Sequence, residues 1–166
     1  MTSEPRSRTR VRKDRQIHEV QHDAYRARAK PKEPAVCPEC GVVFHDGHWV
    51  SGPKPTGAHE HLCPACERIR DDMPAGWVEL SGEFMKHNEP QILALVRNEE
   101  ERTRTEHPLQ RIMEIGHEAD KTVITTTDLH LARRIGDAVQ SAFHGKLEIK
   151  YSKDESLVRV YWSKEN

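Results

Sequence analysis

The sequence predicts an α+β protein: a small zinc-knuckle or zinc-ribbon domain, then helices and a βαββ unit, preceded by a disordered basic arm. Three observations support this class: two CxxC pairs, strand patterns around one amphipathic helix near the C-terminus, and a basic stretch poor in apolar residues at the start. The expected parts are 1–34 for the arm, 35–80 for the zinc-binding domain, 81–116 for a helical connector and 117–166 for the βαββ unit.

The four cysteines of the chain form two CxxC pairs, Cys37 with Cys40 and Cys63 with Cys66. This spacing is typical of a structural zinc site, because two such turns complete one tetrahedral sphere of thiolates. A proline fixes φ inside each pair, and Gly41 suits the left-handed backbone that closes the first turn. The sequence therefore predicts zinc as the cofactor, held by these four residues.

Other uses of the cysteines stay open at this point. Two disulfides would need an oxidising compartment, and a redox-active motif would need only one CxxC pair. Iron in a rubredoxin-like site would use the same four thiolates. One cysteine could also be replaced as a ligand by His59 or His61, which lie near the second pair in the sequence.

The charge of the chain is divided between its N-terminal end and the rest. Residues 1–32 hold ten Lys/Arg and four Asp/Glu, a net charge of +6, which leaves a net charge of -7 for residues 33–166. We interpret the basic stretch as a disordered arm that binds along phosphates by releasing counterions, with a solubilising tail as the alternative. The candidate nucleic-acid-binding residues are Arg6, Arg8, Arg10, Arg12, Lys13 and Arg15.

Short elements are predicted in and after the zinc-binding region. Asp46-Gly47 lies between two apolar runs and predicts a tight β-hairpin, whereas the glycines and prolines of residues 51–57 predict a loop. Residues 67–70 favour one or two helical turns after the second cysteine pair. Residues 77–80 favour a short strand.

Two helices are predicted in the connector. Asn88 is expected to cap the first, with Pro90 in its first turn and Gln91 returning the capping hydrogen bond. The acidic run 99–101 is interpreted as a solvated helix face. A second helical segment, ending by Gly116, is predicted from three apolar residues: Leu109, Ile112 and Met113.

The clearest fold signal lies near the C-terminus. Residues 121–126 are β-branched and strand-like, and Thr127 or Asp128 is expected to cap a helix whose apolar residues recur at spacings of three and four. Residues 147–151 and 157–162 alternate between apolar and polar side chains, as strands do. We expect a three-stranded sheet covered by this one helix.

Catalytic and membrane signals are missing from the sequence. It contains no nucleophile elbow, HExxH, P-loop or GxGxxG motif, so we expect no enzyme, and an enzyme of unknown type is the remotest alternative. No apolar run approaches the length of a membrane span, and the N-terminal region lacks the apolar core of a signal peptide. The expected location is therefore the cytoplasm.

Three stretches carry a family resemblance: the paired CPxC motifs, residues 98–101 leading to His107-Pro108-Leu109, and the block 125–136. Together they resemble the N-terminal region of the "nonsense-mediated decay three" proteins, archaeal and eukaryotic adaptors for export or maturation of the large ribosomal subunit. The chain is similar to a short, stand-alone bacterial version, over roughly residues 35–162. The family has four CxxC pairs and further domains that this chain lacks, so the resemblance implies zinc but not subunit export.

The function predicted from the sequence is that of a zinc-stabilised cytoplasmic binding protein. Its expected partner is ribosomal RNA or the ribosome, with Trp49 or Tyr151 as stacking surfaces for bases. The alternative is a protein-protein adaptor that uses an exposed sheet face or an edge strand, with zinc purely structural. Salt separates the two, because binding to phosphates weakens steeply with salt and binding through an apolar interface does not.

Overall fold

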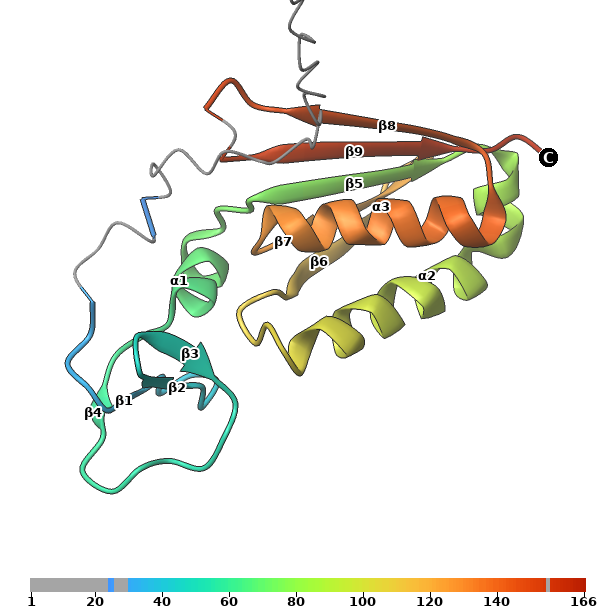
Figure 1. Ribbon diagram of the computed structural model, residues 1–166. Helices are drawn as coiled ribbons and strands as arrows, with labels where there is room; N and C mark the ends of the chain where they lie inside the picture. Colours follow the sequence, from blue (N-terminus) through green and yellow to red (C-terminus); the bar gives the residue numbers. More distant parts are fainter. Residues whose placement is uncertain (1–23, 26–29, 155) are drawn as a thin grey trace, which may run out of the picture.

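The computed structural model describes residues 24–25, 30–154 and 156–166 of the chain. Within them the chain forms two β-sheets and three helices (Figure 1), which confirms the predicted α+β class. The smaller sheet lies at one end of the molecule, and the larger sheet with the two long helices forms the rest. The six basic residues predicted to bind nucleic acid lie outside the described residues.

The smaller sheet contains the segment between the two cysteine pairs. Its strand order is β3-β2-β1-β4, with β1 antiparallel to β2 and parallel to β4. The strands are β1 (Ala35–Val36), β2 (Val43–His45), β3 (His48–Val50) and β4 (His59–Glu60). Helix α1 (Pro64–Asp71) follows this sheet and leads towards the larger one.

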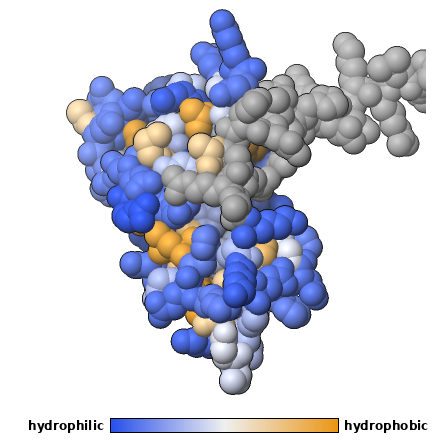
Figure 2. Space-filling view, turned by 90° about the vertical axis from the view of Figure 1, so that its left-hand side faces the viewer, coloured by the Kyte–Doolittle hydropathy of each residue, from blue (hydrophilic) through white to orange (hydrophobic). Residues whose placement is uncertain are grey.

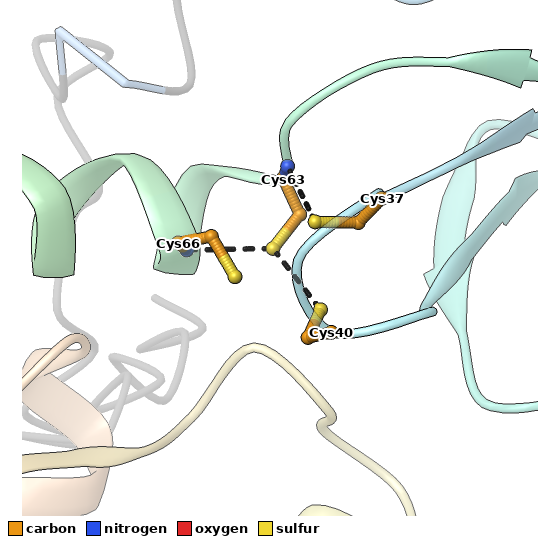
Figure 3. A group of neighbouring side chains, drawn as sticks. All are labelled: Cys37, Cys40, Cys63 and Cys66. Carbon is orange, nitrogen blue, oxygen red and sulfur yellow. Dashed lines mark hydrogen bonds between the residues drawn. The ribbon is translucent and has the colours of Figure 1, made fainter.

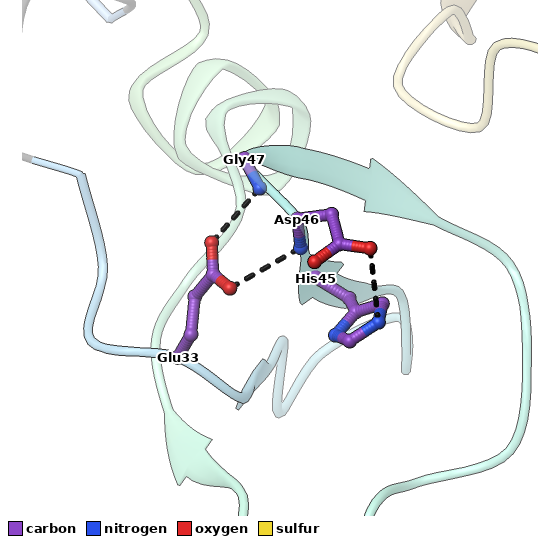
Figure 4. A network of polar contacts seen from close by, with 4 residues as sticks. All are labelled: Glu33, His45, Asp46 and Gly47. Carbon is purple, nitrogen blue, oxygen red and sulfur yellow. Dashed lines mark hydrogen bonds and ion pairs between the residues drawn. The ribbon is translucent and has the colours of Figure 1, made fainter.

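The predicted hairpin at Asp46-Gly47 is confirmed and joins β2 to β3. Asp46 has a φ of 49° and Gly47 a φ of 78°, the two left-handed conformations that a type I′ turn requires. The carboxylate of Glu33 accepts the backbone N–H of both residues, at 3.2 and 2.8 Å (Figure 4). The chain segment before β1 is thereby fixed against the tip of the hairpin.

The larger sheet has five strands in the order β6-β7-β5-β9-β8. Its strands are β5 (Gly76–Ser81), β6 (Ile112–His117), β7 (Lys121–Thr126), β8 (Lys146–Tyr151) and β9 (Val158–Ser163). With α3 (Leu129–Phe143), the last three form the predicted order of strand, helix, strand and strand. The expected sheet of three strands was too small, because β5 and β6 join it as well.

Strand β5 lies at the centre of this sheet, although the domain division predicted from the sequence placed residues 35–80, and so most of β5, in the zinc-binding domain. It pairs antiparallel with β7 and parallel with β9. Its alternating pattern puts Val78 and Leu80 into the core of the larger sheet, where both are fully buried. An alternating pattern of this kind shows which face of a strand is buried, but it does not show which sheet the strand joins.

The predicted second helical segment of the connector is wrong, since Ile112–His117 is the edge strand β6. Ile112 and Ile115 pair with Thr126 and Ile124 of β7, and the register shifts between Ile112 and Glu114. A β-bulge adds one residue to a strand. Ile112 and Ile115 therefore lie on the same face although they are three residues apart rather than two. This spacing imitates the periodicity of a helix.

Helix α2 (Glu83–Arg104) begins earlier than predicted and is kinked at Asn88. Asn88 has a φ of -124° and a ψ of 17°, and its side-chain amide donates to the carbonyl of Phe84 at 2.9 Å. Pro90 explains the kink, because its ring has no N–H and clashes with the carbonyl one turn earlier. Asn88 therefore lies at a kink inside the helix rather than at its N-cap.

The acidic run near the end of α2 is only partly the solvated face that we expected. Glu99 is buried, with 8% of its surface exposed, and pairs with Arg102 at 3.1 Å. The carboxylate of Glu100 accepts the backbone N–H of Ile112 at 2.9 Å. Two of the three carboxylates thus fix local structure, and only Glu101 is exposed.

Helices α2 and α3 both pack on one face of the larger sheet (Figure 1). The core between them contains side chains of both helices and of β5, β7 and β9: Val78, Leu80, Ile92, Val96, Ile124, Leu131, Ile135, Val139, Val160 and Trp162. Gly136 lets α3 approach β9 closely, since a Cβ there would stand 2.5 Å from a methyl carbon of Val160. Among the described residues, no helix is both long and apolar enough to cross a membrane.

Candidate metal centre

The four cysteine sulfurs converge on one point between β1, α1 and the loop after β1 (Figure 3). All four sulfurs lie within 4.8 Å of one another, and those of Cys40 and Cys63 are 3.7 Å apart. A tetrahedron with metal–sulfur bonds of about 2.3 Å has edges of about 3.8 Å, whereas a disulfide bond is about 2.05 Å long. The structure thus brings together all four predicted ligands as free thiols at the spacing of a metal site.

A tight turn positions the first cysteine pair. The backbone N–H of Cys37 donates to the carbonyl of Val42 at 2.8 Å, and the N–H of Gly41 donates to the carbonyl of Cys37 at 2.9 Å. Gly41 has a φ of 79°, the left-handed conformation predicted for it. This turn directs both sulfurs of the pair towards the second one.

The second pair lies at the start of α1. Cys63 is the N-cap residue, with Pro64 in the first turn, and the sulfur of Cys63 accepts the backbone N–H of Cys66 at 3.4 Å. The N–H of Cys63 donates in turn to the sulfur of Cys37 at 3.4 Å. Backbone N–H groups at a helix start favour negative charge, so this geometry favours thiolates.

Arg111 is a fifth member of the cluster that sequence reasoning missed. Its guanidinium group is buried and donates to the sulfur of Cys40 at 2.9 Å and to that of Cys66 at 3.4 Å. It also donates to the sulfur of Cys63 at 3.7 Å, and its Nε donates to the carbonyl of Pro108 at 3.0 Å. Arg111 comes from the segment between α2 and β6, so it connects the larger sheet to the cysteine cluster. Nothing in its sequence neighbourhood signals this role.

The thiols of the cluster differ in their tendency to ionise. Burial opposes ionisation of Cys37, but backbone N–H groups outweigh it and lower the pKa of that thiol to about 7. Burial raises the pKa of Cys66 to about 11 and raises the pKa of Cys63 further. Burial works against the charge of Arg111, yet its hydrogen bonds to Cys40 and Cys66 raise the pKa of the guanidinium group. Four thiolates this close repel one another. The positive charge of Arg111, added to that of a bound metal ion, therefore favours the ionisation of all four thiols.

The cluster is closed. Cys37, Cys63 and Cys66 are buried and Cys40 is half-buried. Four protein ligands fill the tetrahedral sphere of a metal such as zinc and leave no position for a substrate. Val42, Ala65 and the partly buried Leu109 pack around the cluster. The arrangement suits a structural metal ion that holds β1, α1 and the segment before β6 together.

The histidines near the cluster are not part of it. In the described part of the chain, the four cysteines form a ligand group without His59 or His61, both of which are exposed. A second group, formed by Glu33, His45 and Asp46, is fully exposed. The carboxylate of Glu33 already accepts two backbone N–H groups (Figure 4), so this group is a turn-stabilising contact.

The two aromatic residues predicted as stacking surfaces lie far apart. Trp49 is half-buried on β3 and packs against Phe44 and His61, with ring centroids 5.2 and 6.2 Å away. Tyr151 is exposed at the end of β8, where its hydroxyl accepts a hydrogen bond from Arg133 at 3.2 Å. The structure does not bring them into one surface.

The fold and the site together define a class: a closed four-cysteine metal centre joined to a five-stranded sheet with two helices on one face. No protein-family model matches the chain, and neither a curated protein nor a solved structure matches it. The resemblance to the ribosomal-subunit adaptors therefore stays a hypothesis that rests on the residues named for it.

Proposed function

We propose that the chain is a zinc-stabilised binding protein of the cytoplasm that associates with ribosomal RNA or the ribosome. Zinc suits the site because it prefers tetrahedral sulfur ligands and serves as a structural ion without redox chemistry. A site whose four positions are all filled by the protein supports binding rather than catalysis. Free thiols at metal-site spacing fit a reducing compartment such as the cytoplasm.

The division of charge along the chain is the observation that best supports an anionic partner. A net charge of +6 in residues 1–32 attracts polyanions, whereas a net charge of -7 in residues 33–166 repels them. Binding to RNA would therefore depend on contacts made by the basic arm. Tyr25, inside this arm, contacts α1: its hydroxyl donates to Asp71 at 3.2 Å, and its ring lies 4.4 Å from the guanidinium carbon of Arg68.

The surface gives less support to an apolar protein-protein interface. On the face in Figure 2, apolar residues form small patches separated by hydrophilic ones. The large apolar side chains that are exposed among the described residues lie on separate elements: Val50, Ile69, Met73 and Tyr151. Docking of proteins through apolar contacts normally uses a contiguous patch. A polar, charged partner therefore fits this surface better.

The test compares the full-length protein with a variant in which the six arm residues become glutamine: Arg6, Arg8, Arg10, Arg12, Lys13 and Arg15. Sedimentation with ribosomal particles and binding to ribosomal RNA are measured over a salt series. Each phosphate contact adds about -0.7 to -0.9 to the slope of log K against log salt, so about four contacts give a slope near -3. The variant should show a flatter slope and lose most of the association.

A control variant replaces Lys54 and Lys153, two exposed lysines outside the arm, by glutamine. It should bind almost as the unchanged protein does. Equal slopes for the unchanged protein and the arm variant would make the arm a solubilising tail. Association that resists salt would instead favour the protein-protein adaptor.

A further inference from the structure

Among the residues that the structure describes, no helix covers one face of the larger sheet. Helices α2 and α3 both pack on the opposite face (Figure 1). Side chains alternate along a strand, so the residues between the buried ones of β5 and β9 lie on the open face. These residues are Trp77, Glu79 and Ser81 on β5, and Arg159, Tyr161 and Ser163 on β9.

Two aromatic side chains lie on this open face at the centre of the sheet. Strands β5 and β9 are parallel neighbours, with Trp77 opposite Arg159 and Glu79 opposite Tyr161. Trp77 and Tyr161 are therefore diagonal neighbours, one strand apart and two residues apart along the strands, about 8 Å between Cα atoms. Both are half-buried, as side chains lying on a sheet surface are.

Positive charge accompanies each ring. The guanidinium carbon of Arg159 lies 4.3 Å from the ring centroid of Trp77, and the ammonium nitrogen of Lys150 lies 5.4 Å from that of Tyr161. Arg159 is exposed and forms no ion pair with any described residue. Its guanidinium group lies over the indole ring, and its N–H groups are available to a ligand.

Two acidic residues of the same face are paired with lysines, and a third, the exposed Glu114, lies on the edge strand β6, away from β9 and β8. Glu79 pairs with Lys121 at 3.2 Å, and Glu148 pairs with Lys150 at 3.5 Å. By strand register Lys146 also lies on this face, where it is exposed and, within the described part of the chain, in no ion pair. Arg159 and Lys146 thus leave uncompensated positive charge beside the rings, although residues 33–166 as a whole carry a net charge of -7.

We infer that this open face binds single-stranded RNA, with unpaired bases stacked on Trp77 and Tyr161 and phosphates contacted by Arg159 and Lys146. Every base has a flat π-surface, so aromatic rings and guanidinium planes bind unpaired bases, whereas a duplex hides its bases from a sheet surface. Val123 is the only aliphatic residue that β5, β7 and β9 present on this face. A protein partner would meet little apolar surface here.

This inference rests on the proposed association with RNA and adds a second binding surface to it. The arm supplies affinity for phosphates, and the sheet face supplies preference for unpaired bases. Fluorescence anisotropy measures binding of the full-length protein to a single strand of about 12 uridines and to an RNA duplex of the same length. The test variant is Trp77→Leu with Tyr161→Leu. The matched control is Tyr151→Leu, which removes an exposed aromatic ring from the opposite face of the sheet.

The double variant should bind the single strand more weakly, by about 5- to 150-fold for each ring that stacks on a base, and should bind the duplex unchanged. Tyr151→Leu should change neither affinity. Arg159→Gln should reduce the salt slope for the single strand by about 0.7. Circular dichroism and bound metal confirm that each variant is folded.

Three outcomes would overturn the inference. Equal binding of the single strand by the double variant and the unchanged protein, with binding lost on substitution of the arm, would leave the proposed function standing and remove the sheet face from it. Loss of ribosome association by the double variant, without any binding to free RNA, would make the face a protein-docking surface. No binding to RNA or ribosomes by the unchanged protein would reject the proposed function itself.

Discussion

The guanidinium group of Arg111 lies between two parts of the chain that are far apart in sequence. It is 7% exposed and contacts the sulfurs of Cys40 and Cys66, which lie 71 and 45 residues before it. A metal ion bound by four thiolates carries a net negative charge, and burial makes that charge costly unless a cation lies beside it. Arg111 supplies this cation, and its forked guanidinium group donates to three of the four sulfurs.

Replacing Arg111 by methionine should weaken metal retention by about 10- to 100-fold, as loss of a hydrogen bond to a metal ligand commonly does. Arg111→Lys should give an intermediate effect, because lysine keeps the charge but not the fork. Competition with a chromogenic chelator measures the affinity. Arg97→Met, at an exposed position on α2, serves as the control. If Arg111→Met retains metal as well as Arg97→Met does, the guanidinium group is only a packing contact.

At the scale of elements, local signals account for what the sequence predicted correctly. The Asp46-Gly47 turn and the series β7, α3, β8 and β9 each carry their own signal, namely a turn dipeptide, an N-cap at Asp128 and regular periodicity. Asp128 accepts the backbone N–H groups of His130 and Leu131, as expected for a capping residue. These features depend on residues close in sequence, so the local sequence is enough to predict them.

Predictions failed where the deciding contact is distant in sequence. The bulge near Ile112 gives a strand a helix-like spacing that only its pairing with β7 explains. The location of β5 depends on β9, about 80 residues later. For the candidate site, the cysteine spacing predicted which four residues cluster, but Arg111 has no motif that could identify it. The aromatic pair on the open sheet face also emerges only from strand register.

Helix α3 offers a test of the core. Ile135 is fully buried between this helix and the sheet. Ile135→Asp should cost several kcal/mol, because it buries an unpaired charge, and a small domain has only about 5–15 kcal/mol of stability to lose. A thermal melt measures the effect. The control is Asp137→Asn, at an exposed position of the same helix two residues after Ile135. It should melt like the unchanged protein. A melt of Ile135→Asp that matches this control would mean that the helix does not face the core.

At the scale of the whole molecule, the described residues form two cores. One surrounds the cysteine cluster, and the other lies between the larger sheet and its two helices. The first contains few large apolar side chains beside the cysteines, so we expect it to depend on a bound metal for stability. Binding of zinc to such sites contributes roughly 10–16 kcal/mol, which here is folding free energy.

The purified protein should contain one zinc ion per chain, and removing it with a chelator should unfold the smaller sheet and α1 while the larger sheet persists. Metal analysis gives the stoichiometry, and hydrogen exchange read by mass spectrometry locates the change. Loss of protection should fall on residues 35–71, with β5 to β9 protected as before. Absence of bound metal, or full metal content in Cys40→Ser with Cys66→Ser, would contradict the assignment.

Strand β9 has a consequence for the order in which the protein folds during its synthesis. It lies between β5 and β8, so the centre of the larger sheet cannot form until residues 158–163 have left the ribosome. The four cysteines, Arg111 and Thr127, which hydrogen-bonds to the backbone of Arg111, all precede β9 in the sequence, so we expect a nascent chain to bind metal before β9 has emerged. A chain that stops before residue 157 should therefore keep its metal-binding half and expose the edge of β5 that normally pairs with β9, an unpaired sheet edge that is a template for aggregation.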